Sequence, residues 1–274
     1  DVAPSRGLGD VYKRQDVRQP RLSWRIESDE QNVIQTAYHI LVASSPELLE
    51  QGKGDIWDSG KIESDASQWI TYQGKTLKCN APYYWKVKID TNKGATNWSA
   101  LAFWTTGLFN EADWQGQWIG LDRAALGDSE TQWSRLAARY LRKEFAVKKS
   151  VKRATVHIAG MGLYELFING QRIGNQVLAP APTDYRKTIL YNTYDVTSLL
   201  QTENAIGVTL GNGRFYTMRQ NYKPYKIPTF GYPKLRLNLI VEYADGSKET
   251  IATNTSWKLT TEGPIPVSYT HLRA

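Results

Sequence analysis

The chain has 274 residues, enough for two domains of ordinary size, each with its own buried core. Its formal charge of +7 comes from basic residues that are interleaved with acidic ones, which argues against a phosphate-binding stripe and a nucleic-acid partner. The single cysteine, Cys79, excludes an internal disulfide, and no Cys or His cluster points to a metal. No apolar run reaches membrane-spanning length. Without a visible signal peptide, periplasmic, extracellular and cytoplasmic locations all stay open.

The two ends of the sequence differ from the part between them. Residues 5–15 and 267–274 follow neither a strand nor a helix period, and both resemble sequencing-adapter read-through in fragments assembled from metagenomic reads. We therefore expect residues 1–15 and 267–274 to be non-native and leave them out of the fold prediction. Ordinary frayed termini are the alternative. On the first interpretation the native sequence runs from near Asp16 to near Pro266 and is a piece of a longer gene product.

Residues 16–107 are expected to form a β-sandwich. Apolar and polar residues alternate around Trp24 and from Tyr83 to Ile89, as in strands with one buried face. The run 37–43 is apolar on both sides and predicts a central strand, and residues 47–50 predict one helical turn. Short strands separated by turns, without a long helix, indicate two packed sheets.

The segment Pro82-Tyr83-Tyr84-Trp85-Lys86-Val87 resembles a fibronectin type III (immunoglobulin-like) domain, as does the pair Trp98-Ser99. Leu77 and Tyr83 have the spacing of the tyrosine corner, in which a Tyr hydroxyl bonds back to the backbone. The resemblance implies a spacer or packing module without a reactive site. Trp57 and Trp69 are expected in the core, and ligand contact is the alternative for both.

Residues 108–266 are expected to form a second all-β module, a jelly-roll β-sandwich that is incomplete at its C-terminal end. Alternating segments begin at Leu141 and at Ala154, the latter broken by Gly160-Met161-Gly162. Asn169-Gly170 between two such segments is the strongest short hairpin signal, because both turn residues need positive φ. A second hairpin is predicted at Asp245-Gly246, and residues 196–200 predict only a short turn.

A set of motifs in this second module resembles the domain that precedes the catalytic domain in bacterial α-L-rhamnosidases of glycoside hydrolase family 78. The motifs occur in the order of that family and cover most of residues 115–265. They lie at residues 164–174, 178–180, 183–186, 194–197 and 210–213, and at Tyr216. The resemblance implies a longer enzyme that removes terminal α-L-rhamnose from glycosides or polysaccharides. It also implies that the catalytic α/α barrel follows these residues.

The resemblance implies that no catalytic residue lies within this chain. Inverting glycosidases need a carboxylic acid and a carboxylate that holds a water molecule, and in this family both lie in the helical barrel. Asp184, Glu165 and Asp195 are conceivable substitutes, but their contexts predict a turn residue, an exposed strand residue and a cap. We therefore expect the chain alone to be inactive.

Carbohydrate recognition remains as a function for the second module. Aromatic rings at Tyr185, Tyr216 and Tyr222 suit stacking on a deoxysugar. Some members of the family hold calcium beside the turn after the Asn-Gly hairpin; here that turn, Gly174-Asn175-Gln176, is neutral, so neither calcium nor another cofactor is expected. The candidate sugar-binding residues are Asn175, Gln176, Asp184, Tyr185, Asn212, Arg214 and Tyr216. The alternative for residues 211–216 is a loop that packs against the catalytic barrel.

Three functions remain to be compared. The first is a non-catalytic part of an α-L-rhamnosidase that supports the catalytic domain of the same polypeptide and binds rhamnose-containing glycans. The second is a free-standing β-sandwich protein for carbohydrate binding or adhesion. The third, a small complete hydrolase, lacks a convincing acid and base.

Overall fold

The computed structural model describes residues 2–4, 14–15, 17–123, 136–216 and 230–263. The chain divides into two compact units, Asp1–Asp113 and Trp114–Ala274. Both consist almost entirely of antiparallel β-structure, so the prediction of an all-β fold is confirmed. Within the described ranges, no helix has the length and apolar character needed to cross a membrane.

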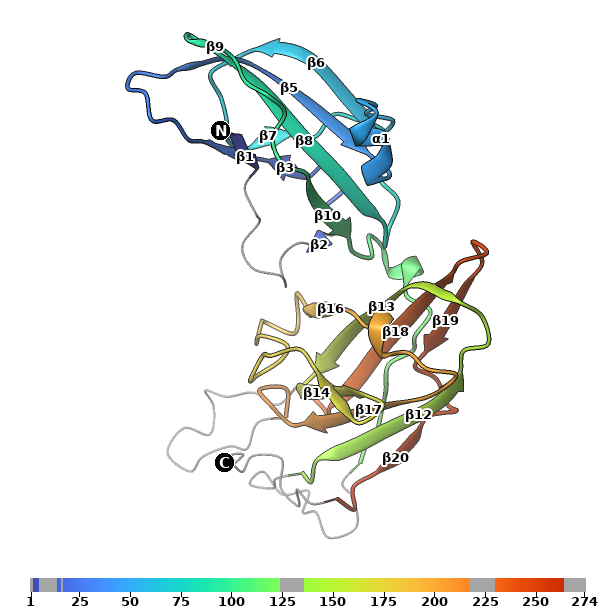
Figure 1. The fold of residues 1–274 in the computed structure, drawn as a ribbon. Helices are drawn as coiled ribbons and strands as arrows, with labels where there is room; N and C mark the ends of the chain where they lie inside the picture. The colour runs from blue at the N-terminus through green and yellow to red at the C-terminus, as the bar shows by residue number, and fades with distance from the viewer. Residues whose placement is uncertain (1, 5–13, 16, 124–135, 217–229, 264–274) are drawn as a thin grey trace, which may run out of the picture. The chain divides into compact units, whose positions relative to one another are not determined.

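The first unit is built around one sheet with the order β2-β10-β8-β5-β6, on which β9 pairs with β8 (Figure 1). Two small sheets, β1-β4 and β3-β7, accompany it. Its elements are β1 (Val2–Pro4), β2 (Arg14–Gln15), β3 (Arg21–Leu22), β4 (Trp24–Ile26), β5 (Gln35–Ala43), α1 (Pro46–Glu50), β6 (Trp57–Glu63), β7 (Ile70–Thr71), β8 (Pro82–Thr91), β9 (Gly94–Ala95), β10 (Ala102–Thr106) and the 3-10 turn Glu111–Asp113.

Aromatic side chains fill the core of the first unit. One face of β8 carries Tyr83 and Trp85 into it, and Tyr83 stacks on Trp104 with 5.6 Å between ring centroids. The backbone N–H of Lys78 donates a hydrogen bond of 2.7 Å to the Tyr83 hydroxyl, which confirms the predicted tyrosine corner. Trp57 packs against this core as predicted.

The prediction for Trp69 is wrong. Its side chain is 68% exposed, and its backbone has a φ of 60°, a conformation that L-residues other than Asn and Asp seldom adopt. The guanidinium of Arg21 covers the ring at 5.5 Å from its centroid. The two-residue pairing of β3 with β7 places Trp69 just before the edge strand, where its ring has no core to enter.

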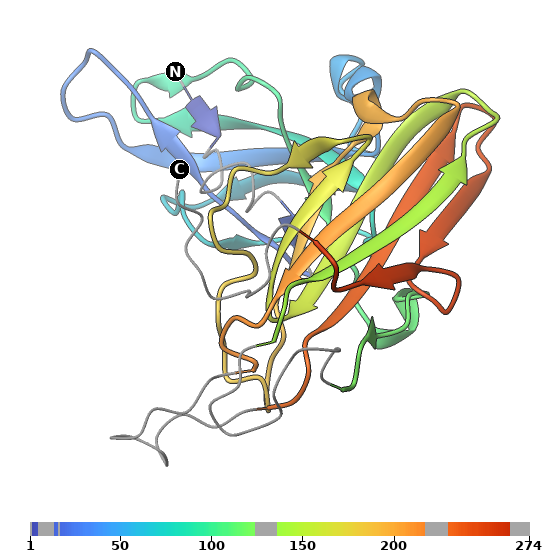
Figure 2. The same cartoon turned by 90° about the horizontal axis from the view of Figure 1, so that it is seen from below.

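The strands of the second unit, coloured green to red in Figures 1 and 2, form two sheets. One has the order β11-β18-β13-β16 with β19 paired to β18, and the other has the order β15-β14-β17-β12-β20. The elements are β11 (Ile119–Gly120), β12 (Arg139–Ala146), β13 (Val151–Met161), β14 (Leu163–Ile168), β15 (Gln171–Ile173), β16 (Tyr191–Asp195), the 3-10 turn Thr197–Leu199, β17 (Glu203–Gly211), β18 (Lys234–Tyr243), β19 (Lys248–Ala252) and β20 (Lys258–Thr260).

Both sheets contribute to a single apolar core, as in a β-sandwich. Val156 on β13 and Leu237 on β18 enter it from one sheet, and Leu166 on β14 and Val208 on β17 enter it from the other. All four side chains are buried.

The predicted hairpins are confirmed. Ile168 pairs with Gln171, and only Asn169 and Gly170 connect them, with φ of 51° and 82°. The connection from β18 to β19 contains Asp245 and Gly246. Gly162 alone connects β13 in one sheet to β14 in the other. The strand β13 therefore continues through Gly160 and Met161, where the sequence predicted a break.

The sheet of β13 and β18 is buried on both faces, which the sequence did not predict. The chain segment before β11 covers its outer face. There the Gly116 N–H donates a 2.8 Å hydrogen bond to Oδ1 of Asn238, and Arg236 Nε donates one of 2.6 Å to the Gly116 carbonyl. His157 lies fully buried on the same sheet, with Nδ1 3.0 Å from the Thr193 hydroxyl.

Candidate functional site

Tyr185 belongs to an aromatic cluster together with Phe215 and Phe230. Its ring meets both phenyl rings edge to face, with centroid distances of 5.3 Å and 5.4 Å. The Phe230 N–H donates a 2.9 Å hydrogen bond to the Phe215 carbonyl, so the segments that carry the two rings are also joined through the backbone. We call these three residues the aromatic cluster.

The hydroxyl of Tyr185 is the polar group of this cluster. It is buried and has no hydrogen-bond partner within the part of the chain that the structure describes. Burial raises the pKa of Tyr185, and the nearby positive charge of Arg214 opposes that rise. A buried hydroxyl without a partner costs about 1–3 kcal/mol, so a hydrogen bond to it would stabilise the cluster.

The other predicted residues of this loop have different surroundings. Arg214 is exposed, and Tyr216 is half-buried and stacks on Tyr232 with a centroid distance of 5.6 Å. Asn212 is 1% exposed, and its Nδ2 donates a hydrogen bond to the Leu136 carbonyl. Asn212 therefore holds the loop in place from within. Tyr222 lies outside the described residues.

Asp184 is engaged by its own turn. Its carboxylate accepts hydrogen bonds of 3.0 Å and 3.2 Å from the guanidinium of Arg186, which hold the pKa of Asp184 below its ordinary value of 3.8. Its carbonyl accepts hydrogen bonds from the N–H groups of Lys187 and Thr188. An exposed carboxylate with a low pKa is ionised at neutral pH and is unsuited to protonating a leaving group.

Asn175 and Gln176 belong to a second group. Gln176 Oε1 accepts a 2.9 Å hydrogen bond from the Tyr194 hydroxyl, and its carbonyl accepts one of 2.6 Å from Arg172. Asn175 is exposed beside them. Among the described residues, no hydrogen bond or ring contact joins this group to the aromatic cluster. The structure thus brings Tyr185 close to Arg214 but divides the seven predicted residues between two places.

The carboxylates considered as catalytic substitutes are also used locally. Glu165 forms an ion pair with Arg172 at 3.2 Å, and Asp195 accepts a 3.0 Å hydrogen bond from the Thr197 N–H. Glu165 lies on β14 and Asp195 on β16, in different sheets. Within the described ranges, no group of three or more His, Cys, Asp or Glu side chains is placed to hold a metal ion.

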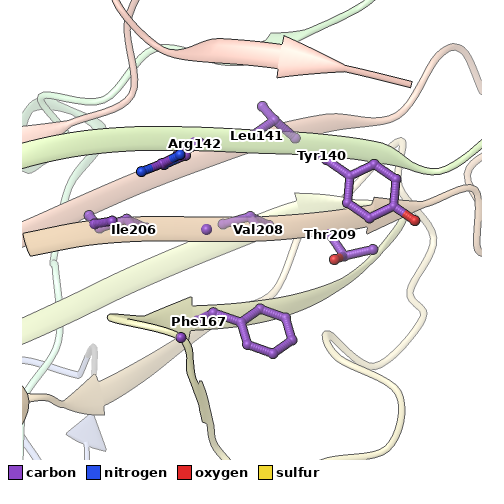
Figure 3. Close-up of a pocket in the computed structure, with 10 residues that line it drawn as sticks. Tyr140, Leu141, Arg142, Phe167, Ile206, Val208 and Thr209 are labelled. Carbon is purple, nitrogen blue, oxygen red and sulfur yellow. The ribbon is translucent and has the colours of Figure 1, made fainter. Parts of the chain in front are cut away.

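The sequence prediction missed a groove on the outer face of the sheet β15-β14-β17-β12-β20. It has a volume of about 430 Å³ and runs across β17 between β12 and β14 (Figure 3). Two rows of paired residues line it, Phe167–Gly207–Arg142 and Thr209–Tyr140. The sequence signal was Gly207, a glycine in the interior of a strand, which often marks close approach of a ligand or another backbone.

Comparison with known proteins identifies both units. Residues 14–110 match the family model of the Rha78A-like N-terminal immunoglobulin domain, and residues 149–271 match that of the α-L-rhamnosidase N-terminal domain. The chain is 37% identical to an α-L-rhamnosidase of Formosa agariphila in an alignment of 266 positions that covers 90% of this chain and 28% of that protein. An α-L-rhamnosidase of Alteromonas sp. is 34% identical over 90% of the chain and 27% of its own length.

Solved structures agree with these sequence relatives. The α-L-rhamnosidase structure from Dictyoglumus thermophilum matches with a TM-score of 0.80 and 40% identity, over 90% of this chain and 28% of that one. The enzyme from Aspergillus terreus matches with a TM-score of 0.79 and 29% identity, over 95% and 29%. The chain therefore spans less than a third of these relatives. Over residues 14–110 and 149–271, it belongs to the N-terminal immunoglobulin and N-terminal domain families of α-L-rhamnosidases.

Proposed function

We propose that this chain forms the non-catalytic N-terminal part of an α-L-rhamnosidase, in which a catalytic domain on the same polypeptide cleaves terminal α-L-rhamnose from glycosides or polysaccharides. The observation that carries the proposal is the order of the two matched families, at residues 14–110 and 149–271. The alignment with the Formosa agariphila relative agrees with it, since it covers 90% of this chain but 28% of that protein. Asp184 and Glu165 form local ion pairs, and Asp195 accepts a local hydrogen bond. These contacts support a non-catalytic role for the two units.

The native gene sequence beyond the codon for Ile265 tests this assignment. We expect the reading frame to continue into a sequence with the helical pattern of an α/α barrel. A native stop codon at this point, with no rhamnosidase domain encoded downstream, would overturn the assignment in favour of a free-standing β-sandwich binding protein.

We further propose that the second unit recognises rhamnose-bearing glycans at the aromatic cluster. The buried hydroxyl of Tyr185, which has no hydrogen-bond partner among the described residues, and the exposed guanidinium of Arg214 supply hydrogen-bonding groups beside apolar rings. A 6-deoxysugar matches this combination, because it has hydroxyls on its ring and a methyl group at C6. Since the turn at residues 174–176 carries no carboxylate, binding should not need calcium.

Titration calorimetry of the whole chain with L-rhamnose, with and without calcium, tests the recognition site. We expect saturable heat that is independent of calcium. Tyr185→Phe should weaken binding about fivefold to tenfold, the equivalent of one net hydrogen bond. The same variant should unfold no more easily than the wild type, because the removed hydroxyl has no partner in the described fold. Binding that Tyr185→Phe leaves unchanged would contradict this site.

A further inference from the structure

We propose that the groove over Gly207 is a second binding site, separate from the aromatic cluster, that takes a neutral sugar ring. The groove lies on the face of the sheet that points away from the core, because Leu141, Ile206 and Val208 fill the opposite face. Figure 3 shows the rings of Tyr140 and Phe167 on either side of β17, with Thr209 between them. The inference rests on this face alone and holds whether or not the chain serves a rhamnosidase.

The fold does not require a glycine at position 207. Gly207 lies inside the nine-residue strand β17 and does not have a positive φ. A Cβ atom at this position would meet only the Cβ of Phe167, at 3.8 Å, which is an ordinary contact. A glycine in a strand interior costs about 0.5–1 kcal/mol relative to alanine. The open space above Gly207 is therefore a feature of the surface rather than a need of the fold.

The side chains around this space suit a sugar ring, because they offer aromatic surfaces to its apolar face and polar groups to its hydroxyls. Tyr140 and Phe167 are half-buried aromatic residues, and such rings pack on the apolar face of a pyranose. The ring of Tyr140 packs closely against the backbone of Gly263. A Cβ atom added at Gly263 would lie only 2.1 Å from this ring. The hydroxyl of Thr209 and the guanidinium of Arg142 line the same groove and offer hydrogen bonds to ring hydroxyls.

The charges around the groove favour a neutral ligand. Arg142, which lines the groove, pairs with Glu144, and Arg172 on the nearby strand β15 pairs with Glu165, so both cations are compensated. A phosphate or carboxylate ligand would have to displace one of these acids. The same charged rim disfavours a second copy of the chain on this face, because charged residues are depleted in the centres of protein interfaces.

The test is an NMR titration of the whole ¹⁵N-labelled chain with L-rhamnose and, separately, D-galactose. We expect at least one of the two sugars to shift the amide signals of Gly207 and Thr209 in a saturable manner. Gly207→Val fills the groove and should weaken this binding at least about tenfold, and Gly207→Ala should have a smaller effect. Since a β-branched residue suits an exposed strand position, Gly207→Val should unfold at the same temperature as the wild type or above it. Tyr185→Phe is the matched control and should leave the Gly207 shifts unchanged.

Three results would overturn the inference. The first is the absence of saturable shifts at Gly207 and Thr209 with both sugars. The second is shifts there that persist in Gly207→Val. The third is a dependence of these signals on protein concentration alone that Gly207→Val removes, which would assign the groove to self-association. Shifts confined to Tyr185 and Phe215 would refute the groove and leave recognition at the aromatic cluster intact.

Discussion

Arg236 on β18 lies across the indole of Trp114, with 5.1 Å between the guanidinium carbon and the ring centroid. The ring centroid of Trp118 lies 6.0 Å from the same guanidinium carbon. Together with the hydrogen bond from Arg236 Nε to the Gly116 carbonyl, these contacts fix the segment that covers the outer face of β18. This cover explains why buried polar residues such as His157 and Asn238 occur on a face that a two-layer sandwich would leave in water.

Replacing Arg236 by Met should loosen this cover. The substitution keeps the length of the side chain but removes the cation–π contacts and the hydrogen bond, so the free energy of unfolding should fall by about 1–3 kcal/mol. Hydrogen exchange at the Gly116 amide, measured by NMR, should accelerate more than exchange in β13. Arg25→Met, at a 78% exposed side chain, is the control and should change stability by less than about 0.5 kcal/mol. Unchanged protection of Gly116 would show that Arg236 does not hold the segment.

The tyrosine corner of the first unit gives a second prediction. Tyr83→Phe leaves the Lys78 N–H without its acceptor, and the unit should lose about 1–2 kcal/mol of stability in urea unfolding. Tyr84→Phe alters the neighbouring tyrosine, whose ring packs against the separate apolar cluster of Leu41, Ala43 and Leu49. This substitution keeps the ring and should have almost no effect. Equal effects of the two substitutions would contradict a structural role for the Tyr83 hydroxyl.

Alanine substitutions at Gly162 and Gly170 distinguish the cost of a steric clash from the cost of backbone strain. Both have positive φ, but a Cβ at Gly162 would lie 2.3 Å from the Gly211 carbonyl oxygen, whereas nothing lies within 4 Å of a Cβ at Gly170. Gly170→Ala should therefore cost about 1 kcal/mol, the strain of the left-handed conformation. Gly162→Ala should cost about 3 kcal/mol or more, because β14 and β17 must separate. Similar losses in thermal unfolding would show that the turn at Gly162 relaxes freely.

Glu242 should make the second unit sensitive to acid. Burial acts to raise the pKa of Glu242, but hydrogen bonds from Arg153 at 2.7 Å and Lys248 at 3.0 Å outweigh it and hold the pKa below its ordinary value of 4.5. The stabilisation is fully present above the pKa of the unfolded chain and is lost as the pH falls through the folded value.

The variant Glu242→Gln isolates this effect. At pH 7 it should be less stable than the wild type by about 1–3 kcal/mol, because hydrogen bonds to a charged group are lost. Urea unfolding at a series of pH values should show this difference shrinking below pH 4.5. A difference that stays constant down to pH 3 would show that the charge of Glu242 is not involved.

Local patterns were sufficient to predict much of the fold. The alternation around Trp85 places it in the core, and Asn169-Gly170 adopts the positive φ angles that its residue types favour. Features that depend on distant segments were not predictable. Trp69 is exposed because no core lies beside its short edge strand, and β13 is buried on both faces because residues near Gly116 cover it.

In the candidate site, too, local features could be predicted from the sequence and contacts between distant segments could not. The sequence identified Tyr185 and Arg214, which lie near each other, but it did not reveal that Asn212 is buried or that Gln176 bonds to Tyr194. The groove exists because Gly207 has no side chain. It could not be predicted from the sequence, because the strand pairing that places Phe167 and Arg142 on either side of Gly207 is known only from the structure.

We expect these two units to carry no glycosidase activity of their own. Release of p-nitrophenol from its α-L-rhamnoside by the purified chain tests this most directly, with Asp184→Asn and Glu165→Gln as companion variants, since both carboxylates are tied up in local ion pairs. We predict release at the uncatalysed rate for the wild type and for both variants. Turnover by the wild type that either variant abolishes would contradict it.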